Sequence, residues 1–160
     1  MKKISILLLT SLTLMISCSK NDNKPCGFTE STVVAPQSEV NALQAYLGTN
    51  GIVATQHPSG FFYSIETPGA GVTAGLCNAV SVKYVGKLTN GTIFDQTTGS
   101  PATFTLGELI VGWQKGLPLI KPGGKIHLYI PPSLGYGANA NGPISANSNL
   151  IFDMELVAVQ

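Results

Sequence analysis

The sequence predicts an α+β domain in which several antiparallel strands pack against one short amphipathic helix. Most of the chain after residue 60 consists of short apolar runs that alternate with polar residues at period two, which is typical of half-buried strands. Residues 106–116 break this pattern and hold the only tryptophan. There, Leu109, Ile110 and Trp113 recur at a spacing that places three large apolar groups on one side of a helix. Pro118 limits this helix to about two to three turns, so it needs packing against the strands to be stable.

The first 17 residues are predicted to be a signal peptide. Lys2 and Lys3 form a basic start, and residues 4–16 are uncharged and mostly apolar. An apolar run of about 13 residues is short for a transmembrane helix. The pattern resembles a bacterial lipoprotein signal, in which Cys18 becomes the lipidated first residue after cleavage. The alternative is a signal anchor with an incidental cysteine.

The mature chain is expected to be one domain behind a polar tether. Without the signal, 143 of the 160 residues remain, which suits one domain with an ordinary core. We divide them into a tether over 18–37, a short helical extension over 38–59 and the main domain over 60–160. Ser19, which follows the lipidated cysteine, resembles an outer-membrane sorting signal of some bacteria. We therefore expect a lipid-anchored membrane protein of the cell envelope, with the outer membrane favoured.

The charge of the chain argues against a nucleic-acid partner. The sequence contains no arginine, and the mature part carries seven lysines against eight carboxylates. Phosphate binding generally uses clustered basic side chains, and such a cluster is missing from this sequence.

Two further cysteines, Cys26 and Cys77, lie in the tether and in the main domain. Export to an oxidising compartment would allow them to pair. A disulfide would pin the tether against the domain, whereas the alternative is two unrelated thiols.

A short helix is predicted from Ser38 to Leu47. Val40, Leu43 and Leu47 have helical spacing, Ser38 can serve as the N-cap, and Gly48 follows the last turn. Its expected role is docking against the domain.

The strands follow in order along the rest of the chain. Asn90-Gly91 is a hairpin signal between two of them, and the loop over 133–149 is long enough to suggest a functional role. The expected strands are Phe61 to Ile65, Val80 to Val85, Thr92 to Asp95, a segment with Phe104 and Leu106, Ile126 to Ile130, and Leu150 to Val159.

Four blocks of this sequence resemble, in order, the successive motifs of FKBP-type peptidyl-prolyl cis/trans isomerases. The blocks are VKYVGKLTNGTIFDQ, TFTLGELIVGWQKGLPLIKPGGK, IPPSLGYGANA and NLIFDMEL. The resemblance covers about residues 60–160, and the leading signal and helix are similar to those of exported, membrane-tethered members. It implies a half-barrel of antiparallel strands curled around one short helix.

The resemblance also implies a proline pocket built from aromatic and apolar residues. Its catalytic residues would be Tyr84, Phe94, Asp95, Ile110, Trp113, Tyr136 and Phe152, and its further substrate-binding residues Phe104, Leu109 and Ile144. Trp113 would form the floor, Ile110 would offer its backbone N–H, and Tyr136 its hydroxyl. The alternative is that these aromatic residues are ordinary core.

The function implied is isomerisation of X-Pro bonds in unfolded or loop segments of exported proteins, which would assist their folding. Such rotation makes and breaks no covalent bond, which agrees with a sequence that shows no nucleophile, carboxylate pair or metal-ligand cluster at useful spacing. We therefore expect no metal and no cofactor, and structural roles for His57 and His127. Macrolide inhibitors are further candidate ligands. The alternatives are a non-catalytic module that binds proline peptides or a partner, and a structural domain with a plain core.

The sequence departs from the family pattern at three places. Ala102 stands where many members carry an aromatic residue, and the chain has no arginine to pair with Asp95. Ile144 is followed by Ser145-Ala146 instead of two prolines. Because a buried unpaired carboxylate is unfavourable, we expect Asp95 to be hydrogen-bonded by Tyr136 or another group, or to be solvated.

Overall fold

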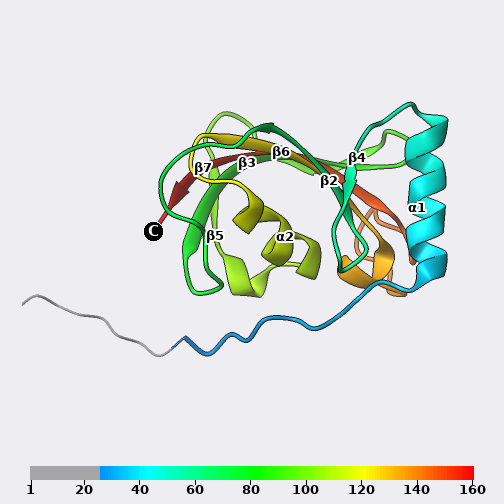
Figure 1. Ribbon diagram of the computed structural model, residues 1–160, viewed down its shortest axis with the longest axis horizontal. Coiled ribbons are helices and arrows are strands. Elements are labelled where there is room, and N and C mark those ends of the chain that lie inside the picture. The colour runs from blue at the N-terminus through cyan, green and yellow to red at the C-terminus, as the bar shows by residue number, and fades with distance from the viewer. Residues whose placement is uncertain (1–25) are drawn as a thin grey trace, which may run out of the picture.

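The computed structural model describes residues 26–160, in which a curved antiparallel sheet holds a short helical layer in its concave face (Figure 1). Within these residues the strands are β1 (Thr55–Gln56), β2 (Phe62–Thr67), β3 (Ala79–Leu88), β4 (Ile93–Gln96), β5 (Ala102–Thr105), β6 (Gly124–Ile130) and β7 (Leu150–Val159). They run in the order β1-β2-β6-β7-β3-β4, and β5 pairs separately with β3. The predicted α+β half-barrel is confirmed.

The centre of the sheet is the antiparallel pair β3 and β7. Tyr84 lies opposite Met154 and Gly86 opposite Phe152, so the residues that alternate toward the concave face come from both strands. Phe152, Met154 and Leu156 are all buried, as the period-two pattern predicted. The hairpin at Asn90-Gly91 is also confirmed, because Gly91 has a φ of 86° and joins β3 to β4.

Most strands differ by one or more residues from their predicted bounds, and β1 was not predicted. β3 continues through Gly86 to Leu88 because β7 pairs with it over this whole length. Leu106 leaves β5 and begins a 3-10 turn instead. In β2, Ile65 is 41% exposed although its period-two spacing suggested burial.

The predicted single helix over 106–116 is wrong in its continuity. The chain forms a 3-10 turn η1 (Leu106–Glu108), then the helix α2 (Val111–Gly116) and a second 3-10 turn η2 (Leu117–Leu119). Leu109 and Ile110, which lie between η1 and α2, have ψ angles of 171° and 149°. These angles belong to an extended backbone, which interrupts the helix. Leu109, Ile110 and Trp113 nevertheless line the same cavity.

Close packing on β6 holds α2 in place. A Cβ atom added at Gly112 would lie 2.5 Å from Ile130, and one added at Gly116 would lie 2.6 Å from Leu128. These glycines therefore allow the helix backbone to approach the sheet directly. Ile130 and Leu128 are fully buried beneath it, and each such side chain contributes about 1.5–3 kcal/mol to folding.

The N-terminal helix α1 (Gln37–Thr49) packs at the end of the sheet opposite the C-terminus (Figure 1). Val40, Leu43 and Leu47 form its buried face, as predicted. The predicted cap is wrong: the helix begins at Gln37 after Pro36, and Ser38 lies within the first turn. The fixed φ of proline suits this position, and the Pro36 carbonyl accepts the Val40 N–H.

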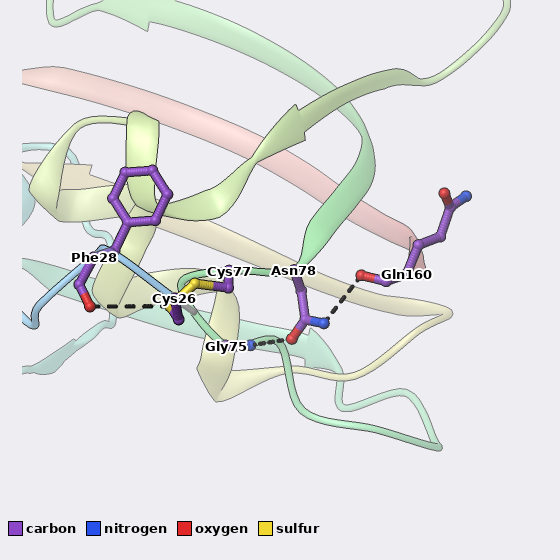
Figure 2. Close-up of a disulfide and its surroundings, with 6 residues drawn as sticks. All are labelled: Cys26, Phe28, Gly75, Cys77, Asn78 and Gln160. Carbon is purple, nitrogen blue, oxygen red and sulfur yellow. Dashed lines mark hydrogen bonds between the residues drawn. A yellow bond between two sulfur atoms is a disulfide. The ribbon is translucent and has the colours of Figure 1, made fainter. Parts of the chain in front are cut away.

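The segment 26–36 runs past the helical layer on the side away from the sheet (Figure 1). A disulfide joins Cys26 to Cys77, with their Cα atoms 5.7 Å apart, so the pairing alternative is the one observed (Figure 2). The Phe28 ring lies against Gly107, where an added Cβ atom would lie 2.4 Å from the ring. At the other end of the segment, the Ala35 N–H bonds to the Ser59 carbonyl at 2.9 Å.

Within residues 26–160 no helix is both long enough and apolar enough to span a bilayer. The signal and Cys18 lie outside the described residues. The division of the chain at residues 17, 37 and 59 stays a prediction.

Candidate functional site

A cavity of about 130 Å³ opens on the concave side of the sheet, above α2. Nine of the ten predicted pocket residues line it. They are Tyr84, Phe94, Asp95, Phe104, Leu109, Ile110, Trp113, Tyr136 and Phe152. The volume equals that of about four waters in the liquid, which is room for a small ring.

The floor of the cavity is a cluster of edge-to-face aromatic rings around Trp113. The indole centroid lies 5.0 Å from that of Tyr84 and 5.1 Å from that of Phe152, at interplanar angles of 80° and 85°. Phe104 packs on the indole at 6.2 Å and Phe94 on Phe152 at 5.5 Å. Edge-to-face pairs are attractive because a positive ring edge meets a negative ring face. The floor is thus rigid and apolar.

Leu109 and Ile110 form the wall that the interrupted helix creates. The Gln114 side chain donates to the Leu109 carbonyl at 2.7 Å and to the Gly107 carbonyl at 3.2 Å, and so fixes the extended link. Among residues 26–160 the Ile110 N–H finds no acceptor. Sequence reasoning missed the role of Gln114, because nothing in a single sequence indicates a contact with carbonyls five and seven residues earlier.

Asp95 lies on the rim and is exposed, so the predicted problem of a buried carboxylate does not arise. Its Oδ2 accepts a hydrogen bond of 2.6 Å from the Tyr84 hydroxyl. Burial, and next the hydrogen bond to Asp95, raise the pKa of Tyr84 well above its ordinary value. The Tyr84 phenol therefore stays protonated and remains a donor. The sequence left Tyr136, another group or solvent as the partner of Asp95, and the structure shows that the partner is Tyr84, with the carboxylate also exposed to solvent.

Thr97 also holds Tyr84, through the backbone. The Thr97 N–H bonds to the Tyr84 carbonyl, and its hydroxyl accepts the Tyr84 N–H, both at 3.0 Å. This second residue was also missed, because it lies in a polar loop with no recognisable motif.

Tyr136 also lines the cavity, from the loop after the 3-10 turn η3 (Pro132–Leu134). Its side chain is 37% exposed. Partial burial, and secondly the charge of Asp95, raise the pKa of its phenol, so this hydroxyl also remains protonated at neutral pH. The rim thus offers hydroxyl and carboxylate groups above an apolar floor.

Ile144 is the predicted pocket residue that the structure places elsewhere. It pairs with Asn141 through reciprocal backbone hydrogen bonds of 2.9 and 3.0 Å, and its side chain is 4% exposed in the core. Ile144 is therefore buried close to this short turn and is not among the residues that line the cavity. Ala102 is likewise not among the lining residues.

Other hollows in the described part of the chain are larger but have a different chemistry. One, of about 300 Å³, lies over the outer sheet surface and is lined by charged and apolar residues together, and another, of about 430 Å³, lies between segment 26–36 and α2. None of them combines a buried aromatic floor with a polar rim, so the smaller cavity is the better site for an apolar ring.

Both histidines make structural contacts. His57 stacks on Phe61 at 4.3 Å, and its Nδ1 lies 2.7 Å from the Ser59 hydroxyl. His127 Nδ1 lies 2.7 Å from Asp153, which also accepts a bond from Lys87 at 2.6 Å. The partner of His127 was missed because it comes from the neighbouring strand.

Residues 72–157 match the family model described as FKBP-type peptidyl-prolyl cis-trans isomerase. An FKBP-type peptidyl-prolyl cis-trans isomerase FkpA of Buchnera aphidicola (subsp. Schizaphis graminum) is 50% identical over 105 residues, which cover 64% of this chain and 42% of that protein. The outer membrane protein MIP of Legionella longbeachae is 39% identical over 123 residues, which cover 72% of this chain and 52% of that protein. This chain thus spans about two fifths to a half of these relatives.

Solved structures share the fold. The crystal structure of FkpA from Escherichia coli matches 78% of this chain over 58% of the FkpA chain, with a TM-score of 0.68 and 36% identity. A peptidyl-prolyl cis-trans isomerase from Pseudomonas syringae pv. tomato matches 81% of this chain and 99% of its own, with a TM-score of 0.68 and 32% identity.

Proposed function

The chain belongs to the FKBP-type peptidyl-prolyl cis-trans isomerase family, and from this premise we propose that it catalyses cis/trans rotation of X-Pro bonds in polypeptides. The observation that carries the proposal is the cavity of about 130 Å³ with an aromatic floor and a polar rim. The substrates of this protein are unfolded or loop segments of exported proteins, and rotation about their X-Pro bonds assists their folding.

Rotation is slow without a catalyst because the twisted amide loses its resonance, which sets a barrier of about 18–20 kcal/mol. The planar amide is more dipolar than the twisted one. An apolar pocket therefore destabilises the planar ground state more than the transition state, and each lowering of the barrier by about 1.4 kcal/mol accelerates rotation tenfold. The proline ring would lie on Trp113, which is only 5% exposed and is flanked by Tyr84 and Phe152.

Two donors at the edge of the floor can orient the substrate. The Ile110 N–H has no acceptor inside the described part of the chain, so it can bind a substrate carbonyl without breaking a bond. The Tyr136 hydroxyl, which is protonated at neutral pH, would bind a second acceptor, and burial raises its pKa further. Fixing the atoms on both sides of the bond favours the rotated geometry. Macrolide inhibitors of the family would compete for the same cavity.

The site of action would be the cell envelope. Lys2, Lys3 and the apolar run before Cys18 support export and lipid attachment at that cysteine, and Ser19 favours the outer membrane. The disulfide between Cys26 and Cys77 agrees with an oxidising compartment. Metabolic labelling with a radioactive fatty acid tests this: wild type should incorporate label and Cys18→Ser should not.

The isomerase proposal is tested with residues 26–160 and an Ala-Leu-Pro-Phe peptide in a protease-coupled assay. Acceleration proportional to protein concentration supports it, and isomerisation at the uncatalysed rate would reject it. The runner-up function is a non-catalytic module that binds proline peptides in the same cavity. Ala102, the absence of an arginine to pair with Asp95 and the Ser145-Ala146 pair after Ile144 favour it. Measurable peptide affinity without faster exchange would select this reading.

A further inference from the structure

Helix α1 lies outside the stretch that matches the family model, yet it contacts the loop that carries Tyr136. Glu39 Oε2 accepts a hydrogen bond of 2.9 Å from the backbone N–H of Ser133, a residue 94 positions later. Glu39 is half-buried in the first turn of α1, where Val40 and Leu43 anchor the helix in the core. The carboxylate is therefore held in a fixed position relative to the sheet.

The peptide group that Glu39 binds is also the anchor of the Tyr136 loop. This group joins Pro132 to Ser133, and its carbonyl oxygen accepts hydrogen bonds from the N–H groups of Gly135 and Gly137, both at 2.9 Å. These two glycines flank Tyr136 directly in the chain. One peptide unit thus donates to a carboxylate on one side and accepts two bonds on the other.

Hydrogen bonds arranged in such a chain strengthen one another, because a charged acceptor at the N–H polarises the carbonyl of the same amide. The anchor matters because it holds the loop on both sides of Tyr136, whereas Ile144 fixes the loop only eight residues later. Residues 138–143 are exposed, and Gly137 has a φ of 65°. Beyond them, the Asn147 N–H returns to the Gly137 carbonyl at 2.8 Å.

We propose that Glu39 is a positioning residue for Tyr136: by binding the Pro132–Ser133 peptide group, it holds the phenol at the rim of the proline pocket. The proposal rests on the proposed function, because it assigns to α1 a part in forming that same pocket. It also gives the N-terminal extension a specific task in substrate binding beyond docking against the core.

Glu39→Ala should lower kcat/KM about three- to tenfold, because the loop loses its charged acceptor while the floor of the pocket is untouched. Glu39→Gln keeps an acceptor oxygen in the same place and should recover much of this loss. Glu30→Gln removes an exposed carboxylate from segment 26–36 and serves as the matched control, with kcat/KM unchanged. Urea unfolding of each variant of the full chain shows that the assay is done on folded protein.

A double-mutant cycle separates positioning from general support of the fold. If Glu39 acts through the phenol, Glu39→Ala should change kcat/KM less than about twofold in a Tyr136→Phe background. An equal loss in both backgrounds, or no loss in wild type, would overturn the proposal.

Amide hydrogen exchange gives a readout that does not depend on activity. Glu39→Ala should speed exchange at Gly135 and Gly137 at least about tenfold, and Glu30→Gln should leave it unchanged. If wild type shows no isomerase activity but exchange responds in this way, the proposed function fails while the positioning contact stands. Unchanged exchange at both glycines would contradict the contact itself.

Discussion

The Tyr84 hydroxyl donates a 2.6 Å hydrogen bond to Asp95, and this bond ties the buried floor of the pocket to its exposed rim. Tyr84 also packs edge-to-face on Trp113 at 5.0 Å, so one side chain connects the indole to the rim carboxylate. The aromatic floor and the polar rim are therefore connected, and a substitution in one should alter the position of side chains in the other.

Asp95→Ala should remove most of the activity, about tenfold or more in kcat/KM, while the domain stays folded. Asp95 is exposed, so its loss leaves no cavity, but the Tyr84 hydroxyl loses its acceptor. Asp95→Asn retains an acceptor oxygen, so its kcat/KM should lie between those of the wild type and Asp95→Ala. Kinetics combined with urea midpoints check this, and full activity in Asp95→Ala would mean that the bond has no part in turnover.

Phe152→Ala should reduce both activity and stability. The ring is 3% exposed and packs on Trp113 and Phe94, so its removal leaves a cavity and should lower the free energy of unfolding by about 3–5 kcal/mol. Met154→Leu, a volume-conserving change two residues along the same face of β7, is the control and should keep the activity. If Phe152→Ala were as active as wild type when folded, the floor would lie elsewhere.

Reduction of the disulfide should destabilise the domain. Cys26 and Cys77 are 51 residues apart, which corresponds to an upper limit of about 4 kcal/mol in the chain-entropy model. The gain is smaller if segment 26–36 moves freely once released. Urea midpoints with and without reductant test this, and Cys26→Ser should equal the reduced wild type in both conditions. An unchanged midpoint on reduction would show that the cross-link does not constrain the unfolded chain.

Acid should weaken the ion-pair network on the outer sheet surface. Partial burial acts to raise the pKa of Asp153, but the hydrogen bonds from Lys87 and His127 outweigh it, and the net shift is downward. The pKa of Asp153 in the folded state is thus below its unfolded value of about 3.9. The stabilisation from the Asp153 network is therefore complete above the unfolded pKa, and it is lost as the pH falls through the folded pKa.

The effect should be about 1 kcal/mol or less, because the Asp153 side chain is 36% exposed and solvent screens the pair. Asp153→Asn should flatten the dependence of the urea midpoint on pH between about 5 and 2. An identical pH profile in wild type and variant would remove Asp153 as its source.

The sequence predicted six of the seven strands in residues 26–160 because strands follow local rules, and it predicted most of the pocket because its motifs resemble those of a known family. Alternation marked Phe152 and Met154 as inward-facing, and Asn90-Gly91 marked a hairpin. The ordered motifs that resemble the family then grouped residues from distant strands into one site, nine of which line the cavity. Periodicity alone could not have separated these aromatic residues from core.

The differences around the pocket concern contacts that a linear pattern does not carry. At the break between Leu109 and Ile110, Gln114 reaches back to two carbonyls, and Ile144 lies in a turn with Asn141. The contact between Glu39 and Ser133 spans 94 residues. Propensities describe local preference, whereas these contacts form only once the sheet has brought the segments together.

The central claim is that the pocket around Trp113 accelerates rotation about an X-Pro bond, and two-dimensional NMR exchange on an Ala-Leu-Pro-Phe peptide at equilibrium tests it most directly. With residues 26–160 at a small fraction of the peptide concentration, exchange cross-peaks between cis and trans forms should appear and should largely vanish with Asp95→Ala. Cross-peaks no stronger than in peptide alone, with wild-type protein shown to be folded, would contradict the account.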